Sequence, residues 1–87
     1  INIQNYINID RKYTIAPNPA KDKLEIQFNQ PVEDYRIYIT DTSGKIVNNF
    51  RSNEQYYQLD LDSLTKGLYF ILIKENNNIY SSKFIKI

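Results

Sequence analysis

Apolar and polar residues alternate along much of the chain, a pattern typical of half-buried β-strands. Segment 23–28 shows it most clearly, because Leu24, Ile26 and Phe28 are apolar while the residues between them are charged or polar. Successive side chains of a strand point to opposite faces of its sheet. The three apolar residues are therefore predicted to face a core, and the residues between them to face water.

Similar segments recur about every ten residues and are separated by turn-forming residues, which favours many short strands. The predicted strands are Tyr13–Ala16, Lys23–Phe28, Asp34–Thr40, Lys45–Arg51, Gln55–Leu61, Leu68–Ile73 and Ile79–Ile87. Leu68–Ile73 is apolar at every position, which predicts a place in the middle of a sheet. No window carries a helical spacing of apolar residues. The pattern predicts an all-β fold, a seven-stranded antiparallel immunoglobulin-like β-sandwich.

Turn residues predict how these strands connect. Asp41-Thr42-Ser43-Gly44 fits a type I turn that ends in a left-handed glycine, and Asn76-Asn77 fits a two-residue hairpin turn. Two hairpins are therefore expected, Tyr35–Phe50 and Leu68–Phe84. In Pro17-Asn18-Pro19 the two prolines fix φ and are expected to end the first strand at the rim of the sandwich.

The length of 87 residues corresponds to one domain. The chain begins with Ile1 rather than Met, so we interpret it as a piece of a longer protein. Residues 1–12 are expected to be a linker or the end of a preceding domain, although the isoleucines among residues 1–9 share one parity, as in a strand. Residues 13–87 are expected to form a C-terminal domain.

Composition argues against most chemistry within this chain. The chain has no Cys and no His, so disulfides, thiol nucleophiles, Ser-His-Asp triads and the usual zinc sites are excluded. Asp60 and Asp62 are predicted to share one face of a strand, where they could form an acid/base pair or a pair of calcium ligands. The Asp- and Gly-rich loop that calcium needs is missing, so a solvated strand face is the favoured interpretation. We therefore expect no enzyme activity, no catalytic residue, no metal and no cofactor.

Charge and hydropathy limit the classes of partner that we expect for this chain. Eleven Lys and Arg against ten Asp and Glu give a net charge of +1. The basic residues are spread from Arg11 to Lys86 without a stripe along the sequence, so nucleic acid is not expected as a partner. No apolar run approaches the roughly 20 residues that span a bilayer, so no membrane span is expected.

Four segments, taken in order, resemble one known family, the C-terminal sorting domain of the Bacteroidetes type IX secretion system. The segments are Ile15–Ala20 with its Pro-Asn-Pro, Ile39–Val47 with Asp41 and Gly44, Leu59–Phe70 with Gly67 and Tyr69, and the basic and apolar tail Lys83–Ile87. The resemblance covers Tyr13 to Ile87.

The resemblance implies a secretion signal rather than a catalyst. A cargo protein N-terminal to the domain would pass through the periplasm and be recognised by the type IX machinery. It would then reach the cell surface or the medium. A surface sorting peptidase would remove the domain and leave the cargo attached to the surface. Recognition is assigned to Lys83, Phe84, Ile85, Lys86 and Ile87. A structural role is assigned to Pro17, Asn18, Pro19, Asp41, Gly44, Gly67 and Tyr69. Deleting the tail is expected to block export and to leave most of the sandwich folded.

The alternative hypothesis is an adhesive or carbohydrate-binding sandwich appended to a surface enzyme. It depends on Tyr38, Tyr56 and Tyr69, which are predicted to lie on the outward faces of their strands. Exposed aromatic side chains recur at binding surfaces. They also cover sheet faces and pair across strands, and the sequence leaves both interpretations open.

Overall fold

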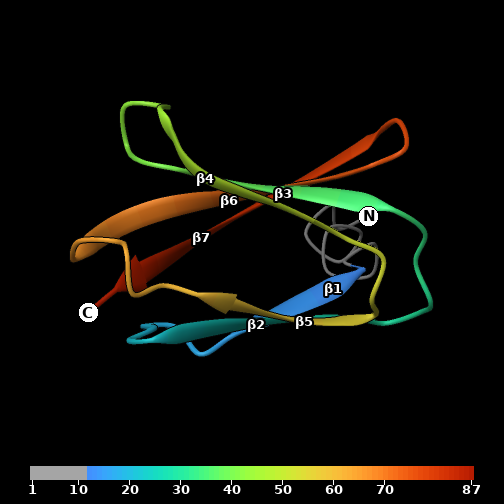
Figure 1. The fold of residues 1–87 in the computed structure, drawn as a ribbon, viewed down its shortest axis with the longest axis horizontal. Coiled ribbons are helices and arrows are strands. Elements are labelled where there is room, and N and C mark those ends of the chain that lie inside the picture. The colour runs from blue at the N-terminus through green and yellow to red at the C-terminus, as the bar shows by residue number, and fades with distance from the viewer. Residues whose placement is uncertain (1–11) are drawn as a thin grey trace, which may run out of the picture.

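Two antiparallel sheets face each other in the computed structural model, which describes residues 12–87 (Figure 1). The strands are β1 (Tyr13–Ala16), β2 (Lys23–Phe28), β3 (Tyr35–Thr40), β4 (Ile46–Ser52), β5 (Tyr56–Asp60), β6 (Gly67–Glu75) and β7 (Asn78–Lys86). One sheet has the order β1-β2-β5 and the other β4-β3-β6-β7. The predicted sandwich is confirmed, and each predicted strand ends within two residues of the observed bounds. The linker expected over residues 1–12 falls, except for Lys12, outside the described residues.

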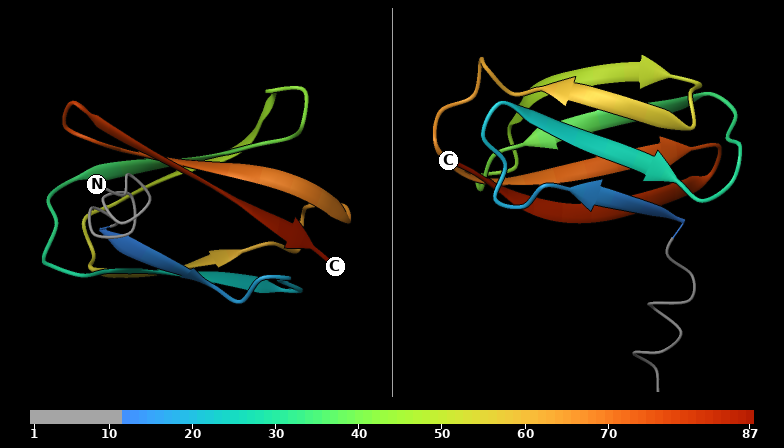
Figure 2. Two further views of the ribbon diagram at one scale, coloured as in Figure 1. Left: turned by 180° about the vertical axis from the view of Figure 1, so that it is seen from behind. Right: turned by 90° about the horizontal axis from the view of Figure 1, so that it is seen from below.

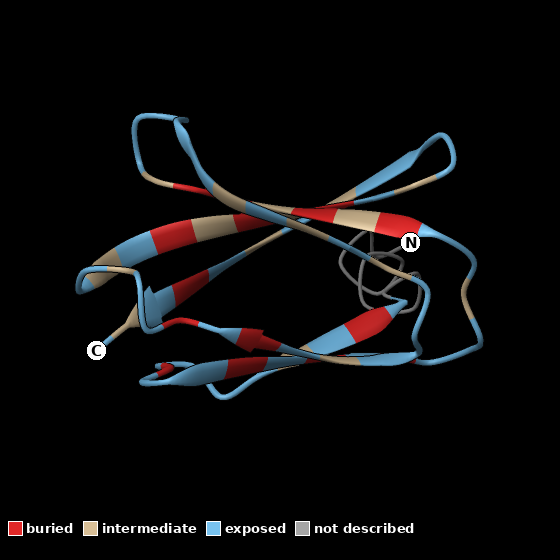
Figure 3. Ribbon diagram, in the orientation of Figure 1, coloured by how far each residue is buried: buried red, intermediate tan, exposed pale blue. Residues whose placement is uncertain are grey.

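Alternate residues of both sheets meet in one core. The largest fully buried side chains are Phe28, Phe84, Leu24, Ile26, Ile37, Ile39, Leu59, Leu61, Ile71 and Ile73. Figure 3 shows buried positions alternating with intermediate or exposed ones along strands of both layers. Burying a side chain of this size contributes about 1.5–3 kcal/mol. The period-two pattern of the sequence therefore sets the inside of the sandwich.

The expected hairpins are present. Tyr35 to Ser52 pair across β3 and β4, and Gly67 to Lys86 pair across β6 and β7. Glu75 pairs with Asn78, so Asn76-Asn77 is the two-residue loop, and of the two only Asn76 has positive φ, at 54°. The register between β3 and β4 shifts between Ile39 and Thr40, and this bulge leaves Val47 without a paired residue on β3.

Tyr69 does not lie on the outward face of its strand, so that prediction is wrong. It is 6% exposed, its ring stacks on Phe84 with centroids 5.7 Å apart, and its hydroxyl donates to the Thr65 carbonyl at 2.7 Å. The cause lies in the sequence of β6, which is apolar on both faces and so gives no sign of which parity points inward. As predicted, β6 lies in the middle of its sheet, between β3 and β7.

Candidate recognition surface at the C-terminal strand

The predicted signal, Lys83–Ile87, lies mostly within β7 and is paired with β6. Leu68 lies opposite Ile85, and Tyr69 lies opposite Phe84. In Figure 1, β7 runs diagonally, so that its C-terminal end approaches the three-stranded sheet. The tail is therefore a strand of the folded sandwich.

Alternation divides the side chains of the tail between two roles. Phe84 is fully buried and stacks on Tyr69, so it belongs to the core. Ile85 is 47% exposed and Ile87 is 51% exposed, and Lys83 is exposed as well. Leu68, opposite Ile85 on β6, is 39% exposed. The outer face of this part of the sheet is therefore apolar with a lysine beside it.

The segment between β1 and β2 covers the other edge of the tail. The Ile85 N–H donates to Asn18 Oδ1 at 3.0 Å, the Ala20 N–H donates to the Ile85 carbonyl at 2.8 Å, and the Ile87 N–H donates to the Ala20 carbonyl at 2.9 Å. Ala20 is fully buried and forms a parallel bridge with Lys86. Figure 2 shows the connection from β1 to β2 and the C-terminus at the same end of the sandwich. We call residues Asn18–Ala20 the clamp.

The clamp includes Asn18 and Pro19 of the Pro-Asn-Pro motif, which therefore contacts the C-terminal tail. The peptide bonds before Pro17 and Pro19 are both cis. Asn18 lies between the two prolines, and its side-chain oxygen accepts a hydrogen bond from the tail. The prediction that the motif ends the first strand at the rim is confirmed, since β1 ends at Ala16. Its contact with residues near position 85 was not predicted.

The other predicted motif residues divide into two groups. Gly67, with φ of 153°, starts β6 opposite Lys86, and Tyr69 packs on Phe84, so both adjoin the tail. Asp41 and Gly44 build the β3–β4 turn and make their hydrogen bonds within it.

Within that turn, one carboxylate oxygen accepts three hydrogen bonds. Asp41 Oδ1 accepts from the Ser43 hydroxyl at 2.6 Å, the Ser43 N–H at 2.9 Å and the Lys45 N–H at 3.0 Å. The Ser43 hydroxyl is the largest cause that holds the pKa of Asp41 below its ordinary value, and the N–H groups of Lys45 and Ser43 act in the same direction. Gly44 follows with φ of 89°.

Asp60 and Asp62 do not share a strand face. β5 ends at Asp60, and Asp62 lies in the turn that follows, where its N–H donates to Asp60 Oδ1 at 2.9 Å. Among residues 12–87 no group of three or more acidic side chains is gathered closely enough to hold a metal ion. The same part of the chain contains no helix of the length and hydropathy needed to cross a membrane.

The three tyrosines of the adhesive hypothesis do not form one platform. Tyr69 is buried, as described above. Tyr38 points outward from β3 in the four-stranded sheet, whereas Tyr56, 43% exposed, points outward from β5 in the three-stranded sheet. The two remaining side chains therefore lie on opposite outer faces of the sandwich.

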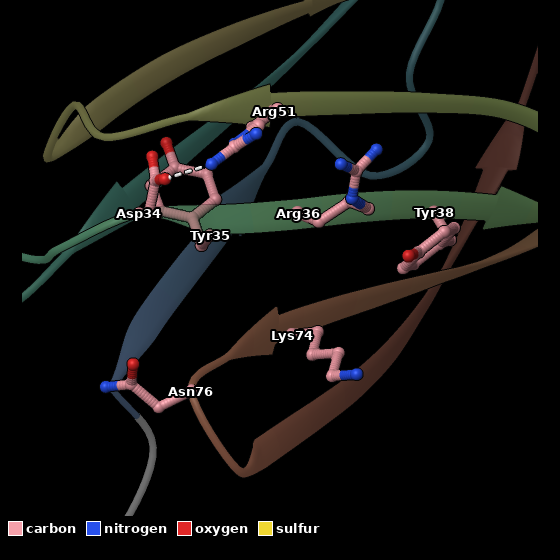
Figure 4. Close-up of a pocket in the computed structure, with 7 residues that line it drawn as sticks. All are labelled: Asp34, Tyr35, Arg36, Tyr38, Arg51, Lys74 and Asn76. Atoms are coloured by element: carbon pink, nitrogen blue, oxygen red, sulfur yellow. Dashed lines mark hydrogen bonds and ion pairs between the residues drawn. The ribbon is translucent and has the colours of Figure 1, made fainter.

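Sequence reasoning missed a row of basic side chains. Arg51, Arg36 and Lys74 lie directly opposite one another on β4, β3 and β6. They line an open hollow of about 290 Å³ with Asp34, Tyr35, Tyr38 and Asn76 (Figure 4). The predicted hairpin turn at Asp41–Gly44 is a signal from which the pairing of Arg36 with Arg51 could be found. The pairing of Arg36 with Lys74 depends on the order of strands in the sheet, for which the sequence gives no local signal. The basic residues form no stripe along the sequence, but three of them form one in the fold.

The chain is similar in sequence to a known protein family and to one of its longer relatives. A family model described as the secretion system C-terminal sorting domain matches residues 14–87. Karilysin from Tannerella forsythia is 31% identical over 85 residues, a match that covers 85% of this chain and 18% of karilysin. The chain therefore spans less than a fifth of that relative's length.

Solved structures share the fold at low sequence identity. A DUF3244 family protein from Bacteroides vulgatus, described as an immunoglobulin-like β-sandwich, has a TM-score of 0.76 and 18% identity, with 91% of this chain and 88% of that chain covered. PorZ, described as a surface component of the type IX secretion system of Porphyromonas gingivalis, has a TM-score of 0.72 and 19% identity, with 86% of this chain and 11% of PorZ covered. These likenesses show an immunoglobulin-like sandwich.

Proposed function

The chain belongs to the secretion system C-terminal sorting domains and is a sorting signal of the type IX system, and on this basis we propose that the export machinery binds the outward side chains at the C-terminal end of the chain, Lys83, Ile85 and Ile87. The domain then acts as a ligand of that machinery rather than as a catalyst. It directs an attached protein to the cell surface or the medium.

The rest of the route is part of the same proposal. A cargo N-terminal to residues 13–87 crosses the periplasm, the type IX machinery binds the folded domain, and a surface peptidase then separates the domain from its cargo, which stays on the cell surface. Karilysin, of which the matched part is 18%, supports the arrangement of a small domain within a longer protein. Residues 1–12 would connect the domain to the cargo.

The observation that carries the proposal is the exposure of Ile85 and Ile87 on a strand that is fixed on both edges. Contact of apolar side chains with water is unfavourable, so the free energy falls when a partner covers them. The clamp and β6 use the backbone groups of residues 85–87. A partner therefore meets the side chains of a folded strand rather than adding a strand of its own at this edge.

Burial of Phe84 changes how the proposal is tested. Removing Lys83–Ile87 deletes a fully buried aromatic side chain and the partner of the clamp. We therefore expect such a truncation to unfold part of the sandwich, whereas the sequence alone predicts that most of it stays folded. Loss of export after truncation would report unfolding as readily as loss of a signal.

Point substitutions separate the two effects. The chain is fused to the C-terminus of a fluorescent protein that folds in the periplasm, in a bacterium that has the type IX system. One fusion is the parent, one carries Ile85→Ser with Ile87→Ser, and a control carries Ile79→Ser. Ile79 is 65% exposed and lies on β7 outside the tail. Fluorescence is measured at the cell surface, in the medium and in the periplasm.

We expect the parent and the Ile79→Ser fusion to leave the cell and the double variant to remain in the periplasm in a folded form. Folding is checked by protease resistance of the retained fusion. Normal export of the double variant would show that these side chains are not the recognised surface. Retention of the parent would show that the domain alone is not a sufficient address.

A further inference from the structure

Three cations occupy adjacent strands on the outer face of the four-stranded sheet. Arg36 on β3 lies opposite Arg51 on β4 and opposite Lys74 on β6. Neighbouring strands are about 4.8 Å apart, so the row of three spans about 10 Å at the backbone. In Figure 4 the three side chains project from their strands around one hollow.

Folding does not account for this row. Like charges directly opposite each other in a sheet destabilise it. Asp34 forms an ion pair with Arg51 at 2.5 Å, but the two side chains are 58% and 64% exposed, so that pair contributes little. Among the described residues that line the hollow, one carboxylate faces three cations, which leaves an excess of positive charge. An anionic ligand would relieve the repulsion that folding creates.

The chemistry of the hollow suggests what kind of anion fits. Two of the three cations are arginines, whose planar guanidinium groups match carboxylate and phosphate in a bidentate geometry. Tyr38 lies beside the row and offers an aromatic ring with a hydroxyl group. Asn76, in the β6–β7 turn, adds an amide that both donates and accepts hydrogen bonds.

The site disfavours a peptide that binds by strand addition. The row crosses β3 and its two neighbours, and the backbone groups of β3 are paired on both edges. A peptide that binds by adding a strand needs a free edge, which the middle of this face does not provide. Side chains alone must therefore hold the ligand. Tyr38 offers an aromatic face for a sugar ring, and the cations beside it can hold an oxyanion.

We propose that the hollow formed by Arg36, Arg51 and Lys74 with Tyr38 and Asn76 binds an anionic saccharide, a sugar ring that bears a carboxylate or phosphate group. The oxyanion lies against the guanidinium and ammonium groups, and the ring lies on Tyr38. This site is separate from the tail residues Ile85 and Ile87, and it does not depend on the export function.

Titration of the isotope-labelled chain by NMR tests the proposal. The probes are a hexamer of galacturonic acid, which carries carboxylates, and phosphorylated pentamannose, which carries phosphate. Maltohexaose is the neutral control, and hexaglutamate is the acidic peptide control. The variants are Arg36→Gln, Lys74→Gln and Tyr38→Ala, with Lys66→Gln as a matched loss of one exposed positive charge in the β5–β6 turn. Thermal unfolding and the amide spectrum of each variant check that it folds.

We expect at least one anionic saccharide to shift the amides of residues around the hollow, with Arg36→Gln, Lys74→Gln and Tyr38→Ala each weakening binding about threefold to tenfold. The Lys66→Gln variant should bind the anionic saccharide as the parent does. Maltohexaose should not bind the parent. Comparing the two anionic probes tells whether carboxylate or phosphate is preferred.

Two outcomes would overturn the proposal. Hexaglutamate binding as tightly as the saccharides, with no effect of Tyr38→Ala, would assign the hollow to an acidic peptide. Absence of any shift around the hollow with both anionic saccharides would leave the row without a saccharide ligand.

Discussion

Asn18 and Ile85 are 67 residues apart in sequence and are joined by a hydrogen bond of 3.0 Å from the Ile85 N–H to Asn18 Oδ1. With the two hydrogen bonds of Ala20 to residues 85 and 87, it fixes the outer edge of the last strand. The Pro-Asn-Pro motif near the start of the domain and the signal at its end are therefore parts of one local structure.

Replacing Asn18 tests this clamp. We expect Asn18→Ala to lower the free energy of unfolding by about 0.5–1.5 kcal/mol, because one hydrogen bond is lost, and to speed hydrogen exchange at the Ile85 amide. Asn53→Ala, an exposed asparagine between β4 and β5, is the control. The measurements are urea unfolding and amide exchange by NMR. Unchanged exchange at Ile85 in Asn18→Ala would show that the hydrogen bond does not hold the strand.

The two glycines adopt backbone angles that favour glycine. Gly44 has φ of 89° and Gly67 has φ of 153°, and an added Cβ at either residue would meet no atom within 4 Å. The expected loss therefore comes from the backbone conformation rather than from a clash. We expect Gly44→Ala and Gly67→Ala each to lower the free energy of unfolding by about 1–2 kcal/mol. Lys66→Ala is the neighbouring control, and melting temperatures equal to that of the parent would contradict the prediction.

Acid should weaken the β3–β4 turn through Asp41. The Ser43 hydroxyl, followed by the N–H groups of Lys45 and Ser43, lowers the pKa of Asp41 in the folded chain. A lowered pKa means that the unfolded chain takes up the proton first as pH falls. The contribution of the carboxylate to stability is therefore complete above the ordinary value of 3.8 and is lost as pH falls through the lower pKa of the folded chain.

Comparison with Asp41→Asn isolates that contribution. We expect the difference in free energy of unfolding between parent and Asp41→Asn to be constant from about pH 7 to pH 5 and to shrink toward pH 2. Glu33→Gln, in the loop before β3, controls for the loss of one exposed carboxylate. Chemical unfolding over this pH range is the measurement. A difference that stays constant down to pH 2 would show that the hydrogen bonds do not favour the ionised form.

The strands were predictable because half-buried β-structure leaves a period of two in the sequence. Leu24, Ile26 and Phe28 were placed correctly on the inner face of β2, and Asp41-Thr42-Ser43-Gly44 was placed correctly at a hairpin turn. Both features are local, because alternation depends on neighbouring residues and a turn on four consecutive ones.

Features that join distant segments were not predictable in the same way. Tyr69 was assigned to the wrong face because an all-apolar strand carries no parity signal. The clamp of Asn18 on Ile85 and the row of Arg36 with Lys74 depend on which strands become neighbours, and strand order is not written in the alternation. The resemblance to the sorting domains supplied the role of the tail, but it did not show which tail residues are buried.

Phe84 and Ile85 are adjacent, and we predict that they serve separate purposes. Phe84 is fully buried against Tyr69, while Ile85 is 47% exposed. Phe84→Ala should lower the free energy of unfolding by about 3–5 kcal/mol, a large part of the roughly 4–13 kcal/mol expected for a domain of this size. Ile85→Ser should lower it by about 1 kcal/mol or less, because much of its side chain is already in water.

Export of a fused cargo should depend on the exposed side chain of Ile85 itself, and on Phe84 only through the stability of the fold. Phe84→Leu keeps an apolar side chain in the core, so it should recover part of the stability lost in Phe84→Ala, and with it export of a fused cargo. Ile85→Ser should remain folded and fail to leave the cell. Urea unfolding of the purified chains and the fraction of fusion found outside the cell are the two measurements. If export instead follows stability across all three variants, then folding is what the machinery requires and Ile85 has no part in recognition.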